Sequence, residues 1–331
     1  MTDLCLREEK MSELRIAVAA EFELCEKIAD FLQQSVLPAE KLSVVEIYPF
    51  TEEQGIRFNN RAVAQLKVDE TEWSDFDYLL FAGDITHAAH LAQAAAAGCV
   101  VVDMKGICSS LSDVPVVVPT VNDEQLTELR QRNIVCLPDV QVTQLALALD
   151  ALMQQNHAKQ LAVTSLLPVS YAGTESVSQL AGQTARLLNG LPIEEGQQRL
   201  AFDVFPTVAT NLNTQLQKIF PQLEQVIFHC VRVPVFYGIS QKVTALCDYE
   251  WDTDALLTAW KAHELLQYEE TLITPVINGE NENAEETVKL HISDLNQREN
   301  VVEFWTVADD QRFNLALLTV KLVELIYRQG Y

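Results

Sequence analysis

The sequence predicts an α/β protein with a doubly wound parallel sheet, followed by an α+β domain built on a mixed sheet. Three observations predict this. The chain has 331 residues, which suits two domains of ordinary size. Over the first 160 residues, short apolar runs alternate with helical patterns. After about residue 158 the apolar runs become longer and alternate with polar residues, which is typical of a second, different sheet.

The first part of the chain predicts a Rossmann-type domain over residues 12–138. Its strands are nearly continuous apolar runs, such as LRIAVAA and CVVVD, which are typical of parallel strands covered on both faces. Strands are expected at 14–20, 42–50, 77–83, 99–103 and 133–138, and helices at 22–35, 86–98 and 142–155. The segment VPVVVPTV is expected to be a connecting arm.

The second part predicts an α+β domain over residues 139–310. Longer strands are expected within LAVTSLLPVS, EQVIFHCVRVPVFYG, SQKVTALCDY, ETVKLHISDL and VVEFWTVADD, with helices at 174–188, 211–220 and 253–265. The segment INGENENAEET is expected to be a polar, acidic loop over 277–287. The amphipathic segment 311–329 is expected to form a C-terminal helix.

The composition makes the protein strongly acidic. Lys and Arg number 23 against 47 Asp and Glu, so the formal charge is −24. Nucleic acids and anionic membranes are bound mainly through Lys and Arg, so the charge argues against both partners. No apolar run is long enough to span a membrane, and MTDLCLREEK lacks the apolar core of a signal peptide. The seven cysteines, Cys5 among them, include no CxxC pair, which favours a reducing cytoplasm.

Six blocks of the sequence resemble the aspartate-semialdehyde dehydrogenase family, over nearly the whole chain from about residue 14. They are VPVVVPTVN, LPDVQVTQLALALDALM, LAGQTARLLNG, LAFDVFP, HCVRVPVFYGIS and DDQRFNLALLTVKLVELI. The stretches LAGQTARLLNGLPIEE, RLAF and FWTVADDQRF are particularly similar to the Usg proteins, a branch of that family that has changed at catalytic positions. The resemblance implies a C-terminal helix that returns to the first domain. It also implies a homodimer formed through the second sheet, to which VIFHCVRVPVFYG is expected to contribute.

The chemistry that the resemblance implies is reductive dephosphorylation of an acyl phosphate with NADPH. A cysteine thiolate forms the covalent intermediate, a histidine moves the proton, and two arginines hold the substrate. The nucleophile motif Asn-Pro-Asn-Cys aligns with 137–140, so Val140 stands at the cysteine position and has no atom that can attack a carbonyl. The histidine position aligns with Ile239, which cannot move a proton.

Two nearby residues are candidates to replace these groups. Cys136 is a candidate displaced nucleophile, but it lies within a predicted strand and not at a helix N-terminus that would lower its pKa. A buried core position is therefore favoured for Cys136. His229 alternates within a predicted strand, where a structural role in the sheet is favoured.

The turn after the first predicted strand is unsuited to NADP. A glycine-rich turn normally lets the pyrophosphate approach a helix N-terminus, but no glycine precedes Gly55. Instead, Glu21, Glu23 and Glu26 are expected where the phosphates would lie. One carboxylate about 5 Å from a phosphate would cost roughly 3 kcal/mol of binding, although carboxylates here would also complement the helix dipole. No cofactor is therefore expected, except NADP if the chain is an active dehydrogenase.

Of the remaining aligned positions, some keep the residue that the family has and others do not. Ser109 aligns with the family's phosphate-binding arginine, Gln215 with a substrate glutamate, and Asp310 with an asparagine that reaches the nicotinamide. Arg232 matches the carboxylate-binding arginine, and Gln144 matches a glutamine at the start of the catalytic helix. Arg232 either holds a small carboxylate ligand or pairs with an acidic side chain near an interface.

Two weaker residue patterns give little evidence for a functional site. His87 and His90 lie three residues apart on one predicted helix face, a spacing that can bind metal. No further His or Cys completes a site, so a partly exposed helix surface is favoured and no metal is expected. Ser165 and Ser170 lack the G-x-S-x-G turn of a hydrolase.

Two functions remain open at this point. The first is a non-catalytic homologue of the dehydrogenases, dimeric and kept for binding or regulation. The second is an NADP-dependent aspartate-semialdehyde dehydrogenase, or a related aldehyde oxidoreductase, that uses unconventional residues. A carboxylate-sensing pocket formed by Arg232 and Gln144 is intermediate between them.

Overall fold

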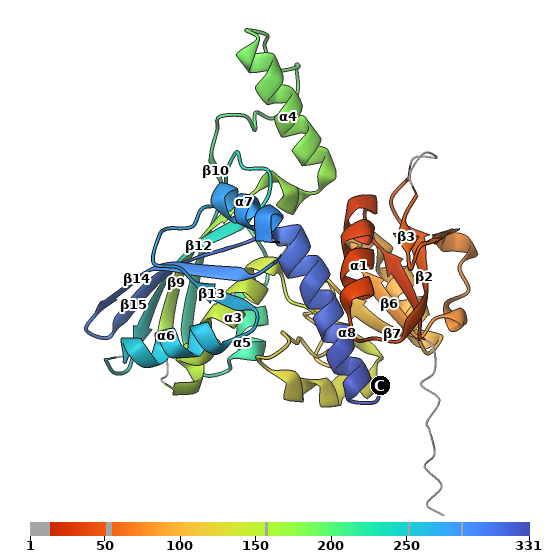
Figure 1. Ribbon diagram of the computed structural model, residues 1–331, viewed down its shortest axis with the longest axis horizontal. Coiled ribbons are helices and arrows are strands. Elements are labelled where there is room, and N and C mark those ends of the chain that lie inside the picture. Colours follow the sequence, from red (N-terminus) through yellow and green to blue (C-terminus); the bar gives the residue numbers. More distant parts are fainter. Residues whose placement is uncertain (1–13, 51–54, 156–157, 251, 286) are drawn as a thin grey trace, which may run out of the picture.

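A computed structural model describes the chain except for residues 1–13, 51–54, 156–157, 251 and 286, and it contains two large sheets (Figure 1). Cys5 and the first two residues of the predicted N-terminal domain lie outside the described residues. Among the described helices, none is long and apolar enough to cross a membrane.

The first sheet has six parallel strands in the order β5-β2-β1-β6-β7-β8. These strands are β1 (Leu14–Ala19), β2 (Ala39–Glu46), β5 (Ala64–Lys67), β6 (Tyr78–Phe81), β7 (Val100–Asp103) and β8 (Ile134–Cys136). The chain leaves β1 for β2 on one side and later places β6 on the other, so the strand order reverses at β1. This confirms the doubly wound sheet, and the carboxyl ends of the strands beside β1 are where such sheets bind ligands.

Helices and short elements complete the first part. Helix α1 (Phe22–Gln34) begins three residues after β1, and α2 (Ala88–Ala96) precedes β7. The shorter elements are β3 (Arg57–Phe58), β4 (Arg61–Ala62), η1 (Val68–Glu70), η2 (Trp73–Asp75), η3 (Ile85–His87) and η4 (Asp123–Gln131). The interior residues of β6, β7 and β8 are buried, as the continuous apolar runs predict, whereas the edge strand β5 is largely exposed.

The second sheet is mixed and has seven strands in the order β10-β11-β9-β12-β15-β14-β13. The strands are β9 (Ala158–Leu167), β10 (Phe205–Thr207), β11 (Gln225–Arg232), β12 (Ile239–Cys247), β13 (Leu266–Tyr268), β14 (Leu290–Arg298) and β15 (Val301–Ala308). The pairs β11–β9 and β13–β14 are parallel and the other pairs are antiparallel. The α+β prediction for this part is therefore confirmed.

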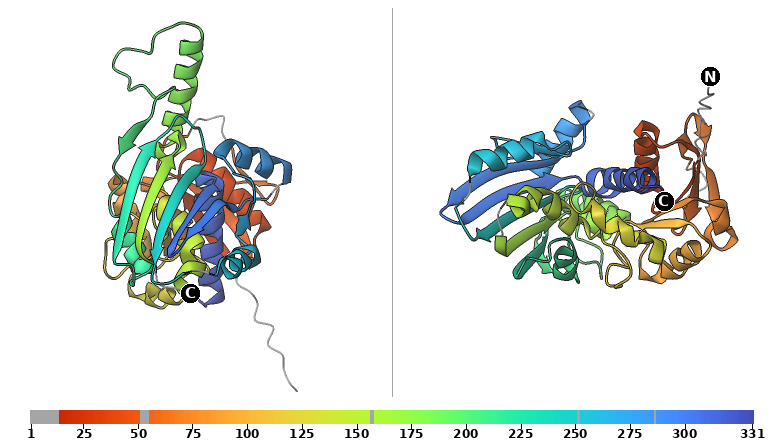
Figure 2. Two further views of the ribbon diagram at one scale, coloured as in Figure 1. Left: turned by 90° about the vertical axis from the view of Figure 1, so that its left-hand side faces the viewer. Right: turned by 90° about the horizontal axis from the view of Figure 1, so that it is seen from below.

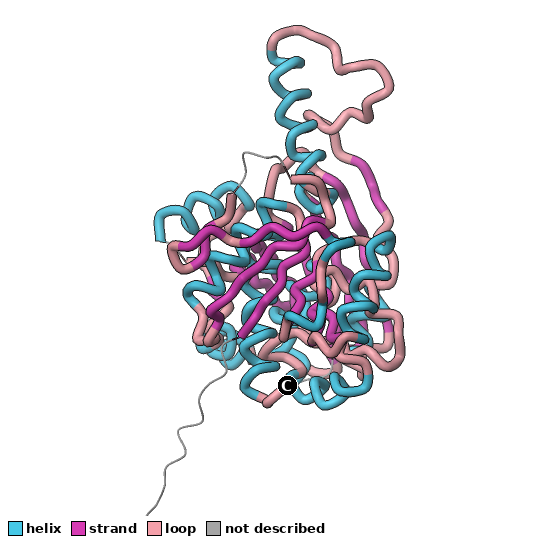
Figure 3. The backbone as a smooth tube through the Cα atoms, turned by 90° about the vertical axis from the view of Figure 1, so that its right-hand side faces the viewer, coloured by secondary structure: helices cyan, strands magenta, loops and turns pink. Residues whose placement is uncertain are grey.

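Helices cover one face of this sheet. Helix α3 (Val140–Gln155) contacts β9 and β15 and packs against α5 (Leu212–Ile219) and α6 (Thr253–Ala262). The Trp260 indole of α6 donates to the carbonyl of Ala148 in α3 over 3.0 Å. Figure 2, left, shows the opposite face of the sheet with no helix in front of β11, β9 and β12. Helix α4 (Thr174–Leu188), after the short η5 (Val169–Ala172), stands away from the rest of the molecule (Figure 1, Figure 3).

The C-terminal segment runs from the second sheet back to the first. After β15, the chain forms a π-helix, η6 (Asp310–Leu317), which continues as α8 (Leu318–Arg328). Both pack against α1, and Figure 1 shows α8 between the two sheets. The Glu324 carboxylate accepts the N–H of Val36, and the Tyr78 hydroxyl donates to the carbonyl of Tyr331 over 2.6 Å.

One expectation about local structure was wrong. Residues 275–285 form helix α7 (Pro275–Glu285) where an acidic loop was expected. Pro275 at the first helical position has its backbone preset for a helix, and Asn278 and Glu282, one turn apart, are buried and bonded to each other. The C-terminal helix expected over 311–329 is confirmed, and its first part is a π-helix. The short strands β3, β4, β5, β10 and β13 were not predicted.

Candidate functional site

A cavity of about 470 Å³, here called the interdomain cavity, lies at the carboxyl ends of the first sheet's strands, against the second part of the chain. Its walls come from the segments after β1, β2, β6, β7 and β8, from η5, and from η6. It is lined by Glu21, Leu24, Tyr48, Asp84, Lys105, Asp139, Val140, Ser170, Tyr171, Ala172, Gly173, Asp310, Gln311 and Leu315. No cysteine or histidine is among these lining residues.

The N-terminus of α3 forms one wall of the cavity. Val140 is the first residue of α3 and reaches the cavity with only 8% of its surface exposed. The preceding Asp139 accepts the N–H of Gln141 (2.9 Å) and the hydroxyl of Tyr171 (2.7 Å). Burial raises the pKa of Asp139, and these hydrogen bonds oppose the shift. The place where a helix N-terminus would activate a thiol thus carries an isopropyl group.

The position of the expected histidine is also closed. Ile239 begins β12 and is fully buried, and its carbonyl accepts from the Gln144 side chain (3.3 Å). Gln144 is itself fully buried and donates to the hydroxyl of Thr306 (2.8 Å). Gln144 therefore joins α3 to the sheet, and it is not among the residues that line the cavity.

Asp310, at the start of η6, is a buried carboxylate that does line the cavity. Its Oδ1 accepts the N–H of Gly238 over 2.9 Å. Burial raises the pKa of Asp310 to about 6, and the neighbouring Asp309 carboxylate adds to the shift. An asparagine at this position would accept the same hydrogen bond without carrying a charge.

The turn after β1 does not fit NADP. Glu21 precedes α1, and its carboxylate accepts the N–H (3.2 Å) and the hydroxyl (2.5 Å) of Thr174 at the start of α4. A Cβ at Gly173 would lie 3.0 Å from a Glu21 oxygen, so the Glu21 side chain closely approaches the backbone at Gly173. A carboxylate therefore occupies the approach to the α1 N-terminus, where a pyrophosphate would need free N–H groups and no negative charge. Of the three glutamates expected at this site, only Glu21 lines the cavity, whereas Glu23 and Glu26 line a separate groove beside Arg57.

Gln215 and Ser109, which align with two substrate-binding residues of the family, contact each other in the structure. The Gln215 side chain donates to the Ser109 hydroxyl (2.9 Å) and accepts the N–H of Asp139 (2.8 Å). Both side chains are buried, at 5% and 3% exposure. A neutral Gln–Ser pair therefore stands where the resemblance implies a glutamate and a phosphate-binding arginine.

The other candidate residues lie away from the cavity lining. The Cys136 thiol is buried and donates to Asp103 (3.1 Å), and burial raises its pKa well above the usual value. His229 is exposed on β11. Arg232 lies over the ring of Phe205 at 5.6 Å and has no ion pair among the described residues, so the structure does not show the acidic partner considered above. Arg232 and Gln144 do not meet at a common pocket among those described.

Histidine and serine patterns have structural roles. His87 Nδ1 lies 3.0 Å from Asp84 in a capping box at η3, and within the described chain no group of three metal-ligating side chains occurs. The Ser165 hydroxyl accepts from Gln241 (3.1 Å) inside the sheet.

Sequence reasoning missed Tyr48, Asp84, Lys105 and Tyr171 as cavity residues. Lys105 and Asp84 follow β7 and β6 directly. The rule that ligands meet the carboxyl ends of parallel strands could have pointed to both. Tyr171 lies far along the chain in η5, and no local signal connects it to this cavity.

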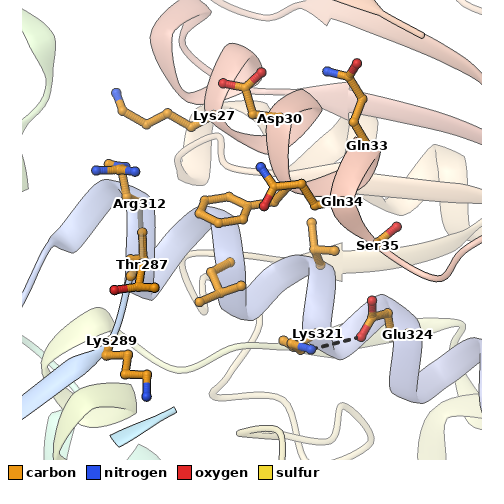
Figure 4. A pocket seen from close by; sticks show the side chains of 14 residues that line it. Lys27, Asp30, Gln33, Gln34, Ser35, Thr287, Lys289, Arg312, Lys321 and Glu324 are labelled. Atoms are coloured by element: carbon orange, nitrogen blue, oxygen red, sulfur yellow. Dashed lines mark hydrogen bonds and ion pairs between the residues drawn. The ribbon is translucent and has the colours of Figure 1, made fainter. Parts of the chain in front are cut away.

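A second, more open hollow of about 620 Å³, here called the helix groove, lies between α1 and the C-terminal helices (Figure 4). Most of its cations have acidic partners: Arg312 bonds Glu282 of α7 (3.2 Å), and Lys321 lies 3.4 Å from Glu324. Lys27 lies 3.9 Å from Glu23 in α1. Glu282 is 2% exposed, and burial raises its pKa to about 7, so its pairing with Arg312 is a structural contact.

Comparison with known proteins places this geometry in a family. Residues 149–313 match the family model for the semialdehyde dehydrogenase dimerisation domain. A USG-1 protein homolog from Haemophilus influenzae is 61% identical over 96% of this chain and 99% of its own. The crystal structure of aspartate semialdehyde dehydrogenase II from Vibrio cholerae has a TM-score of 0.87 at 28% identity, covering 97% of this chain and all of that one. An aspartate semialdehyde dehydrogenase from Candida albicans, solved with NADP, shares the fold at a TM-score of 0.72 and 12% identity, covering 96% of this chain and 99% of that one. The chain therefore belongs to the aspartate-semialdehyde dehydrogenase family.

Proposed function

We propose that this protein is a non-catalytic member of its family, which binds a small ligand in the interdomain cavity without covalent or hydride chemistry. The observation that carries the proposal is Val140 at the N-terminus of α3, in a cavity whose described lining has no cysteine or histidine. Covalent catalysis requires a nucleophile with a base to move its proton. Neither group stands where the family's reaction would need it.

The described thiols support the proposal. Burial raises the pKa of Cys25 and of Cys99 to about 12 and that of Cys108 to about 11, and it raises the pKa of Cys136 and Cys230 as well. Because the thiolate is the reactive form, these cysteines are poor nucleophiles at neutral pH. The Glu21–Thr174 contact supports the second part of the proposal, since it puts negative charge where NADP phosphates would bind.

The test is a comparison of the purified protein with the Vibrio cholerae enzyme under identical conditions. We expect no NADP-dependent oxidation of aspartate semialdehyde with phosphate above the blank, and no heat of NADPH binding by calorimetry up to millimolar concentrations. Iodoacetamide should label the native cysteines slowly and without one fast site. Turnover that survives re-purification, together with one rapidly labelled cysteine, would support an active dehydrogenase with unconventional residues.

We also propose that the protein is a homodimer through the uncovered face of the second sheet. Three apolar side chains are on this face: Ile227 of β11, 43% exposed, and the partly exposed Leu166 of β9 and Leu246 of β12. The matching family model is a dimerisation domain, and its residues include these strands. Covering such apolar side chains is a common basis of stable association.

Light scattering after size-exclusion chromatography tests the dimer. Twice the chain mass of 37.1 kDa is expected at micromolar concentration. Ile227→Lys should shift the protein toward monomer because it places a charge in the interface. Val36→Lys is the control, since Val36 is 78% exposed next to α1. A wild-type mass of one chain would contradict the proposal.

A further inference from the structure

The interdomain cavity is lined mainly by acidic charges. Four carboxylates line it, from Glu21, Asp84, Asp139 and Asp310, against a single lysine, Lys105. The ligands that the family resemblance implies, NADPH and an acyl phosphate, are anions. A cavity lined in this way repels anions and attracts cations.

The carboxylates are held in place without being neutralised. Glu21 accepts from Thr174, Asp139 from Tyr171 and from the Gln141 N–H, and Asp310 from the N–H of Gly238. These donors are neutral, so they orient the carboxylates and leave the charge uncompensated. Among described residues, no lysine or arginine lies within ion-pair distance of any of the four carboxylates. Asp84 accepts from the N–H and hydroxyl of Thr86 and lies 3.0 Å from His87 Nδ1, and Lys105 attracts Glu21 and Asp84 from farther away.

An independent feature also points to a ligand. The Ser170 side chain is 4% exposed and lines the same cavity. Its oxygen lies close to Asp310 but makes no hydrogen bond of acceptable geometry with a described residue. The neighbouring Asp310 carboxylate is the natural acceptor for the hydroxyl proton, so the lone pairs of the Ser170 oxygen remain open to a ligand N–H inside the cavity.

The remaining lining fits a short aliphatic chain. Leu24, Val140 and Leu315 supply apolar surface, and the phenol of Tyr48 supplies a further polar contact. The volume of about 470 Å³ lies within the range of about 300–1,000 Å³ usual for small-molecule sites. No described group of three metal-ligating side chains occurs here or elsewhere, which favours an organic cation over a metal ion.

We propose that the interdomain cavity binds a small aliphatic amine carrying more than one positive charge, with Asp310 and Ser170 contacting one ammonium group. This inference rests on the proposed non-catalytic binding function and names the class of its ligand. Asp310 and Ser170 lie beside the N-terminus of α3, so the amine occupies the space that Val140 borders. The methylene chain lies against the apolar wall.

The experiment is calorimetry of the full-length protein at physiological ionic strength with three four-carbon probes of different charge. These are 1,4-diaminobutane, 1,4-butanediol and succinate. We expect saturable binding of the diamine and no binding of the diol or of succinate. Succinate binding, or equal weak responses to all three probes, would overturn the proposal.

Two variants separate the cavity from general attraction to an acidic surface. Asp310→Asn should weaken diamine binding at least tenfold, and Ser170→Ala should weaken it several-fold. Asp30→Asn is the matched control, because Asp30 is exposed on α1 and lines the helix groove instead. Equal diamine binding by wild type and Asp310→Asn would overturn the proposal.

The outcome can be separated from that of the proposed function. Absence of both NADPH turnover and diamine binding would leave the non-catalytic assignment intact and reject the amine. NADPH turnover would reject the non-catalytic assignment whatever the diamine does.

Discussion

The interdomain cavity and the helix groove are both lined by residues of α1 and of the C-terminal segment η6–α8. Leu24 and Asp310 of these elements face the cavity, whereas Lys27 and Arg312 face the groove. Arg312, which lines the groove, lies 3.2 Å from Glu282 of α7, and Lys321 lies 3.4 Å from Glu324. In the cavity the carboxylates meet neutral donors.

This difference separates charged side chains that stabilise the fold from charged side chains that are available to bind a ligand. Paired charges join elements, so removing one partner should cost stability. A carboxylate such as Asp310, whose pKa burial raises, is unfavourable for folding when it is ionised, and its retention fits a role in binding. Three single substitutions test this distinction.

The largest effect is expected from Arg312→Met in the groove. Burial raises the pKa of Glu282 to about 7. The protonated carboxyl therefore stabilises the fold fully when the pH is below the ordinary pKa of a glutamate, and this stabilisation is lost as the pH rises through 7. Without Arg312 this loss should grow, and the free energy of unfolding at pH 8 should fall by about 2–4 kcal/mol. At pH 5 Glu282 is protonated, so the loss should be small.

Urea unfolding at both pH values measures this effect. Arg186→Met is the matched control, since Arg186 of α4 pairs with Glu194 and both side chains are well exposed. An equal loss at pH 5 and pH 8 would show that Arg312 stabilises by packing alone.

The second prediction has the opposite sign. Asp310→Asn keeps an acceptor for the N–H of Gly238 but removes a carboxylate whose pKa is raised to about 6. A raised carboxylate pKa means that stability is lost as pH rises through 6, so the asparagine should stabilise the fold by about 1–3 kcal/mol at pH 8. Near pH 4 the two proteins should be almost equal.

Thermal and urea unfolding across pH 4–8 check this prediction. Asp294→Asn is the control, because Asp294 pairs with Lys242 (2.7 Å) and its pKa is lowered, so its removal should not stabilise. Destabilisation by Asp310→Asn at pH 8 would mean that the cavity carboxylate is a structural group after all.

Local sequence patterns were sufficient for most of the fold. Continuous apolar runs identified strands of the parallel sheet, and helix α4 has the bounds that its pattern predicts. Helix α7 was missed because its composition is polar, and its burial depends on Asn278 and Glu282 facing the rest of the protein. The π-helical start of the C-terminal segment has no signal in the residue pattern.

The candidate site was only partly predictable. Val140 and Ile239 were recognisable because each stands in a block that aligns without gaps. Glu21 was expected to oppose phosphate, but its contact with Thr174 joins residues 153 positions apart, which no local pattern shows. The Ser109–Gln215 pair is likewise a product of the fold, since the two residues were matched separately and are 106 positions apart in the sequence.

The smallest effect is expected from Lys321→Met in the groove. Lys321 lies 3.4 Å from Glu324, one turn away on the same helix, and its side chain is 31% exposed. The Glu324 side chain is 8% exposed, but the partly solvated lysine keeps this pair weak, so the free energy of unfolding should change by less than about 0.5 kcal/mol. The residual effect should shrink further in high salt, because screening acts on a partly solvated lysine. Glu324 also keeps the Val36 N–H as a donor. A loss near that of Arg312→Met would show that the two ion pairs stabilise the fold equally. A negligible loss would show that the pair of Arg312 and Glu282 contributes most of the stability at this groove.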